Sequence, residues 1–177
     1  MGTIVPRASA AKIRLDYSDK DFDIVFTNGC FDLLHIGHVK LLRQAAKEGA
    51  VVVVGINSDR SVRASKGNAR PIIPEIQRAS IVAAIEGVDF VIIFDEDTPL
   101  ELIKELQPDI LVKGQDWETR VVGEEEVENW GGKVVLISMV PDCSTSKTIA
   151  LIVKRHRAME DNPLDRIQFE EGKRPWP

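Results

Sequence analysis

The sequence is poor in cysteine: Cys30 and Cys143 are the only two among its 177 residues. This count suits a reducing compartment and cannot by itself supply a four-ligand zinc site. Long apolar runs are also absent, because no stretch approaches the roughly 18 residues that a membrane-spanning helix needs. The start of the chain, Met1 to Tyr17, has no apolar segment like that of a signal peptide. We therefore expect a cytoplasmic protein without a membrane partner.

An excess of positive charge is absent as well. The chain has 23 Lys and Arg against 28 Asp and Glu, which gives a formal net charge of −5. Proteins that bind nucleic acid or anionic membranes through a general electrostatic field have a basic excess or a basic stripe. No nucleic-acid partner is therefore expected, and any anionic ligand must be held by local groups. With 44% hydrophobic residues, the length suits one domain with short extensions.

Short runs rich in Val and Ile alternate with amphipathic segments, which is typical of buried parallel strands alternating with helices. Strands are predicted at Asp23–Thr27, Val51–Ile56, Phe90–Phe94, Ile110–Lys113 and Lys133–Ser138. Helices are predicted between and after them, at 39–48, 74–86, 99–107, 124–130 and 146–159. The pattern predicts an α/β fold, a Rossmann-like doubly wound parallel sheet of five strands with helices on both faces.

The two ends of the chain lie outside this alternation. Residues 1–20 are predicted to form an N-terminal extension, 21–158 the main domain, and 159–177 a C-terminal tail. The tail lacks helical or strand periodicity and ends in Arg174-Pro175-Trp176-Pro177. Two interpretations of it stay open, a disordered or surface-bound segment and a functional lid.

The most informative segment, Thr27 to His38, follows the first predicted strand. In doubly wound sheets the ligand site lies at the carboxyl ends of the strands, where the strand order reverses. Gly29 permits close backbone approach, and a helix starting near Gly37 directs free N–H groups and its positive dipole end toward that site. His35 and His38 flank the helix start and can donate hydrogen bonds to phosphate oxygens. They could also be capping or surface residues, or a metal-binding pair, although no third ligand is close in sequence.

This segment, Gly29-Cys30-Phe31-Asp32-Leu33-Leu34-His35-Ile36-Gly37-His38, resembles the HxGH signature of the cytidylyltransferase-like nucleotidyltransferases. Enzymes of that superfamily transfer a nucleotidyl group from ATP or CTP to a phosphorylated acceptor and release pyrophosphate. The resemblance implies that His35 and His38 bind the phosphates and stabilise charge on the α-phosphoryl group. It also implies a nucleotide pocket lined by Thr27, Asn28, Gly29, Cys30, Phe31, Asp32 and Gly37. The main domain, 21–158, would then be the nucleotidyltransferase domain.

A second signature follows the fifth predicted strand. Ser144-Thr145-Ser146-Lys147 is similar to the family's ISTSK-type motif, whose hydroxyls and amides hold the nucleotide phosphates. The resemblance therefore implies that Ser144, Thr145 and Ser146 bind the nucleotide. From the residues alone, a Ser/Thr cluster at a helix start is either a phosphate cradle or a simple N-cap.

Two further segments resemble one branch of the superfamily, the D-glycero-β-D-manno-heptose 1-phosphate adenylyltransferases. The first is Arg70-Pro71 with Arg78, and the second is 111–117, which contains Lys113, Gly114 and Asp116. The likeness runs from about Ile24 to His156 and implies that these residues contribute to nucleotide binding.

The related glycerol-3-phosphate cytidylyltransferases share the Asp116-Trp117-Glu118 feature but are expected to carry two arginines where this chain has Glu86 and Val140. Both departures favour ATP over CTP.

Positive groups are needed because a nucleotide triphosphate and a sugar phosphate bring several negative charges into one pocket. Lys66, Arg70, Arg78 and Lys113 are the candidates, with Lys66 assigned to catalysis. The stretch Ser58–Arg70 is interpreted as a basic loop that closes over phosphates, or alternatively as a solvated surface loop.

The predicted reaction transfers AMP from ATP to a sugar 1-phosphate similar to heptose 1-phosphate. The acceptor's ionised phosphate oxygen attacks the α-phosphorus in line, so positioning and charge stabilisation suffice without a strong base. Mg²⁺ is expected as the cofactor, bound mainly through the triphosphate and not in a protein metal site. The resemblance also suggests a homodimer. Alternatives are a cytidylyltransferase for an alditol or amino-alcohol phosphate, an FMN adenylyltransferase, and a catalytically silent nucleotide-binding scaffold.

Overall fold

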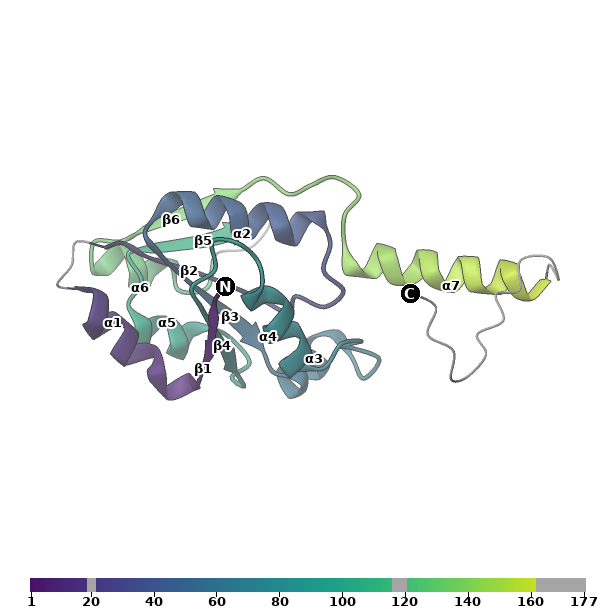
Figure 1. Ribbon diagram of the computed structural model, residues 1–177, viewed down its shortest axis with the longest axis horizontal. Helices are drawn as coiled ribbons and strands as arrows, with labels where there is room; N and C mark the ends of the chain where they lie inside the picture. The colour runs from purple at the N-terminus through teal and green to yellow at the C-terminus, as the bar shows by residue number, and fades with distance from the viewer. Residues whose placement is uncertain (19–21, 116–120, 162–177) are drawn as a thin grey trace. The chain divides into compact units, whose positions relative to one another are not determined.

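The computed structural model of the chain describes residues 1–18, 22–115 and 121–161 and divides into two compact units, Met1–Cys143 and Ser144–Pro177. The strands, all in the first unit, are β1 (Thr3–Val5), β2 (Ile24–Gly29), β3 (Val51–Asn57), β4 (Phe90–Phe94), β5 (Ile110–Gly114) and β6 (Lys133–Ile137). The helices of this unit are η1 (Arg7–Ser9), α1 (Ala10–Ser18), α2 (Ile36–Glu48), α3 (Asp59–Lys66), α4 (Glu75–Ala83), α5 (Leu100–Leu106) and α6 (Glu124–Asn129) (Figure 1). The second unit contains α7 (Thr145–Asp161).

The strands form one parallel sheet in the order β1-β4-β3-β2-β5-β6. From β2 the chain proceeds outward through β3 and β4, then crosses back to β5 and β6 on the other side of β2. The strand order therefore reverses between β2 and β5. In a sheet of this kind the ligand crevice lies at the carboxyl ends of the strands at that switch point.

Two hydrophobic clusters cover the two faces of the sheet. Successive residues of a strand point to opposite faces, so Val25 belongs to one cluster while Ile24 and Phe26 belong to the other. The first cluster includes Leu42 of α2 and residues of α4, and the second includes residues of α1, α5 and α6. The predicted doubly wound α/β architecture with helices on both faces is therefore confirmed.

The prediction of five strands is wrong by one, because residues assigned to an N-terminal extension form the additional strand. β1 pairs in parallel with β4, with Ile4 opposite Val91. The following helix, α1, contributes the buried Ala10 and Ile13 to the cluster that contains α5. A strand of three residues is too short to be recognised from a period-two pattern, and its value lies in covering the edge of β4.

The interpretation of Ser58–Arg70 as a loop is also wrong for its first part, which is helix α3. Ser58 caps the helix by accepting a hydrogen bond from the Ser61 N–H at 3.1 Å. Gly67 ends it with a positive φ of 91°, which glycine adopts without steric cost. The capping serine and the terminal glycine were visible in the sequence, but the segment between them contains one buried aliphatic residue, Val62, and so lacks an apolar stripe.

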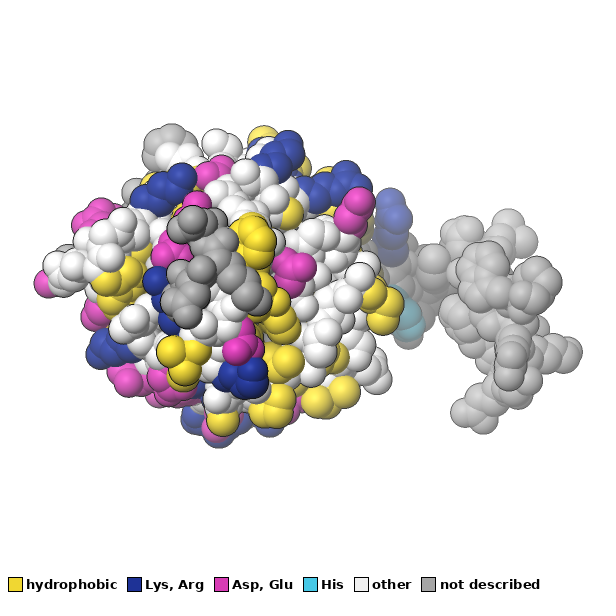
Figure 2. All heavy atoms as spheres, turned by 60° about the vertical axis from the view of Figure 1, so that its left-hand side comes forward, with side chains coloured by type: hydrophobic (Ala, Val, Ile, Leu, Met, Phe, Trp, Pro, Cys, Tyr) yellow, Lys and Arg dark blue, Asp and Glu magenta, His cyan; other side chains and the backbone are white. Residues whose placement is uncertain are grey.

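The face of the molecule drawn in Figure 2 carries charges of both signs. On this face, Lys and Arg side chains are interspersed with Asp and Glu. In the part of the chain that the structure describes, no helix combines the length and the apolar character that crossing a membrane requires.

The packing of α1 predicts that the N-terminal segment stabilises the domain. Ile13 is 5% exposed, so Ile13→Ala is expected to lower the free energy of unfolding by about 2–4 kcal/mol through lost burial and cavity formation. Leu15→Ala on the same helix, where the side chain is 72% exposed, is the matched control and is expected to have little effect. Urea unfolding measures both, and equal small effects would contradict the integration of α1 into the core.

Candidate active site

The carboxyl ends of β2 and β5 meet at the switch point. Lys113 of β5 donates a hydrogen bond from Nζ to Asn28 Oδ1 of β2, which joins the strand ends on either side of the crevice. Burial lowers the pKa of Lys113 to about 8. Gly29 and Gly114 end the two strands, so backbone rather than side chains borders this position. A cation is thus held where the fold places its ligand crevice.

Two histidines stack at the start of α2. The rings of His35 and His38 lie 3.8 Å apart between centroids with an interplanar angle of 20°. The His35 N–H donates to His38 Nδ1 at 3.4 Å. A neutral ring that accepts at Nδ1 carries its proton on Nε2, which makes Nε2–H of His38 a donor. Gly37 allows this arrangement, because a Cβ there would lie 3.0 Å from His35 Nδ1.

The pKa values of both histidines are lowered, which favours their neutral forms. Burial, together with the neighbouring His35, lowers the pKa of His38 from 6.5 to about 4. Burial also lowers the pKa of His35, and its Nδ1 is buried without a hydrogen-bond partner among the described residues. An anion bound at the helix start would favour the protonated forms, since an opposite charge nearby stabilises them. The pair can therefore take up charge when a phosphate arrives.

Asp32 links the HxGH loop (residues 30–38) to the segment before α4. Its carboxylate accepts from the N–H of Ile72 at 2.9 Å, from the N–H of Ile73 at 3.0 Å and from Arg70 Nε at 2.5 Å. Burial raises the pKa of this carboxyl, but the two backbone donors and Arg70 outweigh it, and the net pKa is lowered. Asp32 is therefore an ionised anchor inside the protein.

The residues on either side of Asp32 adopt an unusual backbone conformation. Phe31 and Leu33 both have φ of 49°, in the left-handed region that bulky side chains rarely occupy. Phe31 is nevertheless buried, with its ring 5.2 Å from that of His38. Strained backbone of this kind persists where surrounding contacts hold it and is frequent at functional sites. The hydrogen bonds of Asp32 supply those contacts.

The guanidinium group of Arg70 is held in place by Asp32 along one of its edges. Its Nε binds Asp32, and its side chain is 14% exposed. The terminal Nη1 and Nη2 groups have no protein acceptor among the described residues. A guanidinium fixed at Nε presents its two remaining NH₂ groups in a rigid fork, which matches the geometry of phosphate oxygens.

Three cations surround Cys30, the first residue of the loop. Burial raises the pKa of the Cys30 thiol, while the charges of Lys66, Arg78 and Arg70 act in the opposite direction. The thiol is therefore protonated and not a nucleophile. Lys66, in the last turn of α3, is exposed. Its charge acts on Cys30 and so lies close to the start of the HxGH loop.

Arg78 is buried behind the backbone segments that form the site and does not face solvent. The side chain is 1% exposed. Its guanidinium donates to the backbone carbonyls of Ile73, Cys30 and Asn57 and to the carboxylate of Asp59. Arg78 thus ties the HxGH loop, the end of β3, the start of α3 and the segment before α4 into one edge.

Known proteins resemble this chain in sequence and in fold. A family model described as cytidylyltransferase-like matches residues 26–167. The chain belongs to the cytidylyltransferase-like family. Similar curated proteins include two named bifunctional protein HldE. The one from Koribacter versatilis is 53% identical over 147 residues, 82% of this chain and 30% of that protein. The one from Geotalea uraniireducens is 58% identical over 130 residues, 73% of this chain and 26% of that protein.

This cytidylyltransferase-like chain therefore spans less than a third of the length of these relatives. Among solved structures, a lipopolysaccharide core biosynthesis protein from Thermoplasma volcanium matches with a TM-score of 0.54 and 26% identity, over 67% of this chain and 97% of that one. A pantoate-beta-alanine ligase from Francisella tularensis matches with a TM-score of 0.63 and 16% identity, over 97% of this chain and 82% of that one. The latter likeness concerns the fold alone.

The structure brings together most of the residues singled out from the sequence of this family member. Those grouped around the HxGH loop and the switch point are Asn28, Gly29, Cys30, Phe31, Asp32, His35, Gly37, His38, Lys66, Arg70, Lys113 and Gly114. Thr27 lies in β2 with its Oγ1 buried and without a hydrogen-bond partner among the described residues. Asp116 lies outside the described residues.

The Ser/Thr motif belongs to the second unit. There Ser144 caps α7, because its Oγ accepts from the Lys147 N–H at 3.2 Å. Thr145 and Ser146 form the first turn of that helix. The N-cap interpretation thus holds for Ser144, and phosphate binding by the motif stays a prediction.

Sequence reasoning did not single out Asn57, Ile72 and Ile73. Asn57 is the last residue of β3, and its Oδ1 is 3.9 Å from Cys30 Sγ. Its backbone carbonyl accepts a hydrogen bond from Arg78. Its position at a strand end next to β2 was a usable signal, since that edge of the sheet carries the site. Ile72 and Ile73 act through backbone N–H groups, which the identity of a side chain does not reveal.

The low pKa of His38 predicts a dependence of stability on pH. The folded state resists protonation of His38 between pH 6.5 and about 4, whereas the unfolded chain binds this proton, so stability falls as the pH falls through that window. We expect His38 to account for a loss of about 2 kcal/mol in the free energy of unfolding between about pH 7 and pH 4.5. Urea unfolding across this range measures the loss, and His38→Asn should reduce it by that amount. Parallel curves for the two proteins would contradict the assignment.

Proposed function

We propose that the chain is an adenylyltransferase that transfers AMP from ATP to a sugar 1-phosphate of the heptose 1-phosphate type. The observation that carries the proposal is the stacked pair of histidines at the start of α2, the helix that follows β2 at the switch point of the sheet. The resemblance to heptose 1-phosphate adenylyltransferases and the similarity to proteins named HldE support the choice of acceptor.

The chemistry is a single displacement. An oxygen of the acceptor phosphate forms a bond to the α-phosphorus of ATP, and the bond from that phosphorus to the pyrophosphate oxygen breaks. Nε2–H of His38 and the free N–H groups of α2 are suited to donate to the α-phosphoryl oxygens as charge develops. His35 adds a second imidazole beside it, whose protonated form a bound phosphate would favour. Because the acceptor is already ionised, the site needs no general base.

The cations are placed to bind the remaining negative charge. Arg70 offers the free edge of its guanidinium, and Lys66 adds charge from the end of α3. Lys113 lies on the opposite side of the crevice, next to Asn28. We assign Lys66 and Arg70 to phosphate groups at the mouth and Lys113 to the nucleotide. Arg78 supports these groups through the backbone it holds.

Mg²⁺ is proposed as the cofactor that neutralises part of the triphosphate charge. Within the described ranges, no three His, Cys, Asp or Glu side chains gather in the way a protein metal site requires. Asp32, the only buried carboxylate among the described residues, is occupied by N–H donors. This donor set fits an ion carried by the triphosphate with water completing its shell.

The first test is pyrophosphate release with ATP and D-glycero-β-D-manno-heptose 1-phosphate. His38→Ala is expected to lower kcat by about a hundredfold or more, because a donor to the transition state is lost. Arg43→Ala, an exposed arginine later on α2, is the control and should turn over like the wild type. Replacing ATP by CTP should abolish most of the activity. Wild-type turnover in His38→Ala would refute the mechanism, and a preference for CTP would favour a cytidylyltransferase.

Arg70 provides a second test. Lysine keeps the positive charge but lacks the planar guanidinium group. Its single ammonium group cannot replace a fork that binds Asp32 on one edge and a phosphate on the other. We expect Arg70→Lys to raise KM for ATP or for the sugar phosphate about tenfold, the scale of one charge-assisted hydrogen bond. Steady-state kinetics with each substrate varied in turn measures the effect. Unchanged KM values for both would exclude a role for the Arg70 fork in substrate binding.

A further inference from the structure

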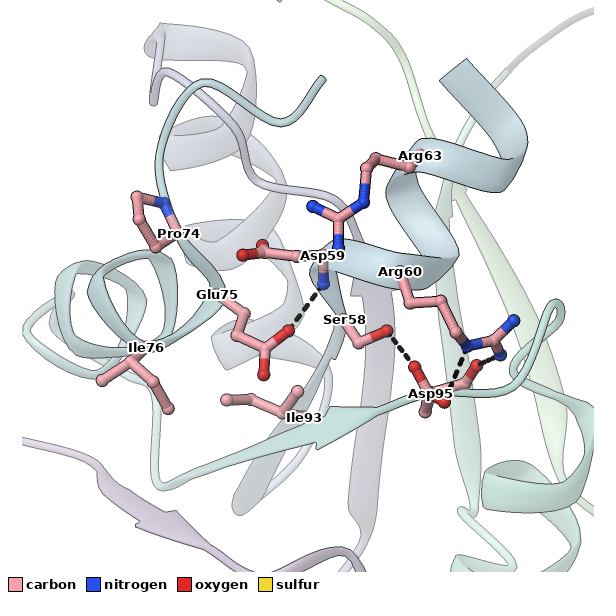
Figure 3. A pocket seen from close by; sticks show the side chains of 9 residues that line it. All are labelled: Ser58, Asp59, Arg60, Arg63, Pro74, Glu75, Ile76, Ile93 and Asp95. Atoms are coloured by element: carbon pink, nitrogen blue, oxygen red, sulfur yellow. Dashed lines mark hydrogen bonds and ion pairs between the residues drawn. The ribbon is translucent and has the colours of Figure 1, made fainter. Parts of the chain in front are cut away.

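A pocket of about 660 Å³ opens next to the HxGH site, at the carboxyl ends of β3 and β4. It lies between the starts of α3 and α4, and none of its residues belongs to the HxGH loop (Figure 3). Its lining consists of Ser58, Asp59, Arg60, Arg63, Pro74, Glu75, Ile76, Ile93 and Asp95. The function proposed above assigns no ligand to it.

The pocket combines an apolar side with carboxylates that retain hydrogen-bonding capacity. Figure 3 shows Ile76 and Ile93 on the same side as Glu75. Glu75 Oε2 accepts from the Asp59 N–H at 2.6 Å, and Asp59 Oδ1 accepts from Arg78 at 2.7 Å. The second oxygen of each carboxylate has no donor among the described residues. Two acceptors are therefore available beside an aliphatic surface.

The two arginines of the pocket differ in their availability. Arg60 is bound to Asp95, which also accepts from Ser58 Oγ. Arg63 has no ion-pair partner among the described residues, and in Figure 3 its guanidinium extends from α3 toward Asp59. Arg63 is thus the donor that a ligand can use.

The charge of the pocket does not suit a second phosphate group. Asp59, Glu75 and Asp95 contribute −3, and Arg60 and Arg63 contribute +2, so the lining carries −1. Hydroxyl groups suit it better, because they donate to carboxylate oxygens and accept from a guanidinium group. The carbon-bound hydrogens of a sugar can pack against Ile76 and Ile93.

The pocket is connected to the HxGH site along α3. This helix of eight residues is about 12 Å long at 1.5 Å per residue. Arg63 lines the pocket from the last turn of this helix, and Lys66, three residues later, acts on Cys30. Arg78 also joins the two regions, since it binds both Asp59 and the Cys30 carbonyl. Because Lys66 and Arg63 lie three residues apart on α3, a ligand with its phosphate near Lys66 would have its other end near Arg63 and Glu75.

We propose that this pocket binds the hydroxyl-bearing end of the acceptor sugar phosphate and selects its length. The acceptor's phosphate lies toward Lys66 and Arg70, while its exocyclic hydroxyls donate to the free oxygens of Asp59 and Glu75 and accept from Arg63. The assignment rests on the proposed function and names the part of the protein that recognises the sugar of the acceptor.

The test compares Arg63→Ala and Glu75→Gln with the control Arg43→Ala. Glutamine keeps an oxygen that can accept from the Asp59 N–H, so Glu75→Gln removes charge with little change in packing. Each protein is assayed with ATP and either D-glycero-β-D-manno-heptose 1-phosphate or mannose 1-phosphate, which lacks the seventh carbon. We expect KM for the heptose phosphate to rise about tenfold in both pocket variants. KM for ATP should be unchanged, and so should any turnover of mannose 1-phosphate, which we expect to be lower than that of the heptose phosphate.

The outcomes separate this proposal from the function on which it rests. If the wild type releases no pyrophosphate with either sugar phosphate, the proposed function fails and the pocket assignment fails with it. If the wild type turns over and both variants match it, only the pocket assignment is overturned. A rise in KM for ATP equal to that for the sugar would also overturn it, because the pocket would then not be selective for the acceptor.

Discussion

The ionised carboxylate of Asp32 is the interaction on which the site depends. Two backbone N–H groups and Arg70 converge on it, and these donors compensate the carboxylate for leaving water. Removing donors from a buried charge costs several kcal/mol, so the loop and the segment before α4 are held to one arrangement. That arrangement fixes the backbone around Phe31 and Leu33, which in turn sets where α2 begins and where its histidines stack.

The electrostatics of the free protein are set by burial rather than by a high density of charge. His35 and His38 have lowered pKa values, as does Lys113, because each is partly withdrawn from water. The two imidazoles add little repulsion to the free site near pH 7, and an anion bound beside them would stabilise their charged forms, whereas Lys113, with a pKa of about 8, is largely charged already. An acidic chain can thus bind a highly charged anion without a basic surface, provided that protonation accompanies binding.

The sequence was sufficient for the features that depend on periodicity and local chemistry. Buried strands such as Phe90–Phe94 and the histidines at the start of α2 were predicted from apolar runs and from the strand-to-helix junction. β1 and α3 were missed because three residues carry no readable period and because α3 buries little of its surface. The Asp32 anchor could not be derived either, since it joins residues about forty positions apart through backbone N–H groups.

Arg78 illustrates why the chemical type of a residue does not by itself assign its role. An arginine near a phosphate site suggests ligand binding, yet this guanidinium is buried and donates to three backbone carbonyls and one carboxylate. Carbonyl oxygens at the ends of parallel strands and in loops have no neighbour in a sheet or helix, and leaving them buried without a donor is costly. A planar group with five N–H donors satisfies several of them at once. At the irregular edge that forms the site, one fully buried cation therefore replaces hydrogen bonds that regular structure would have supplied.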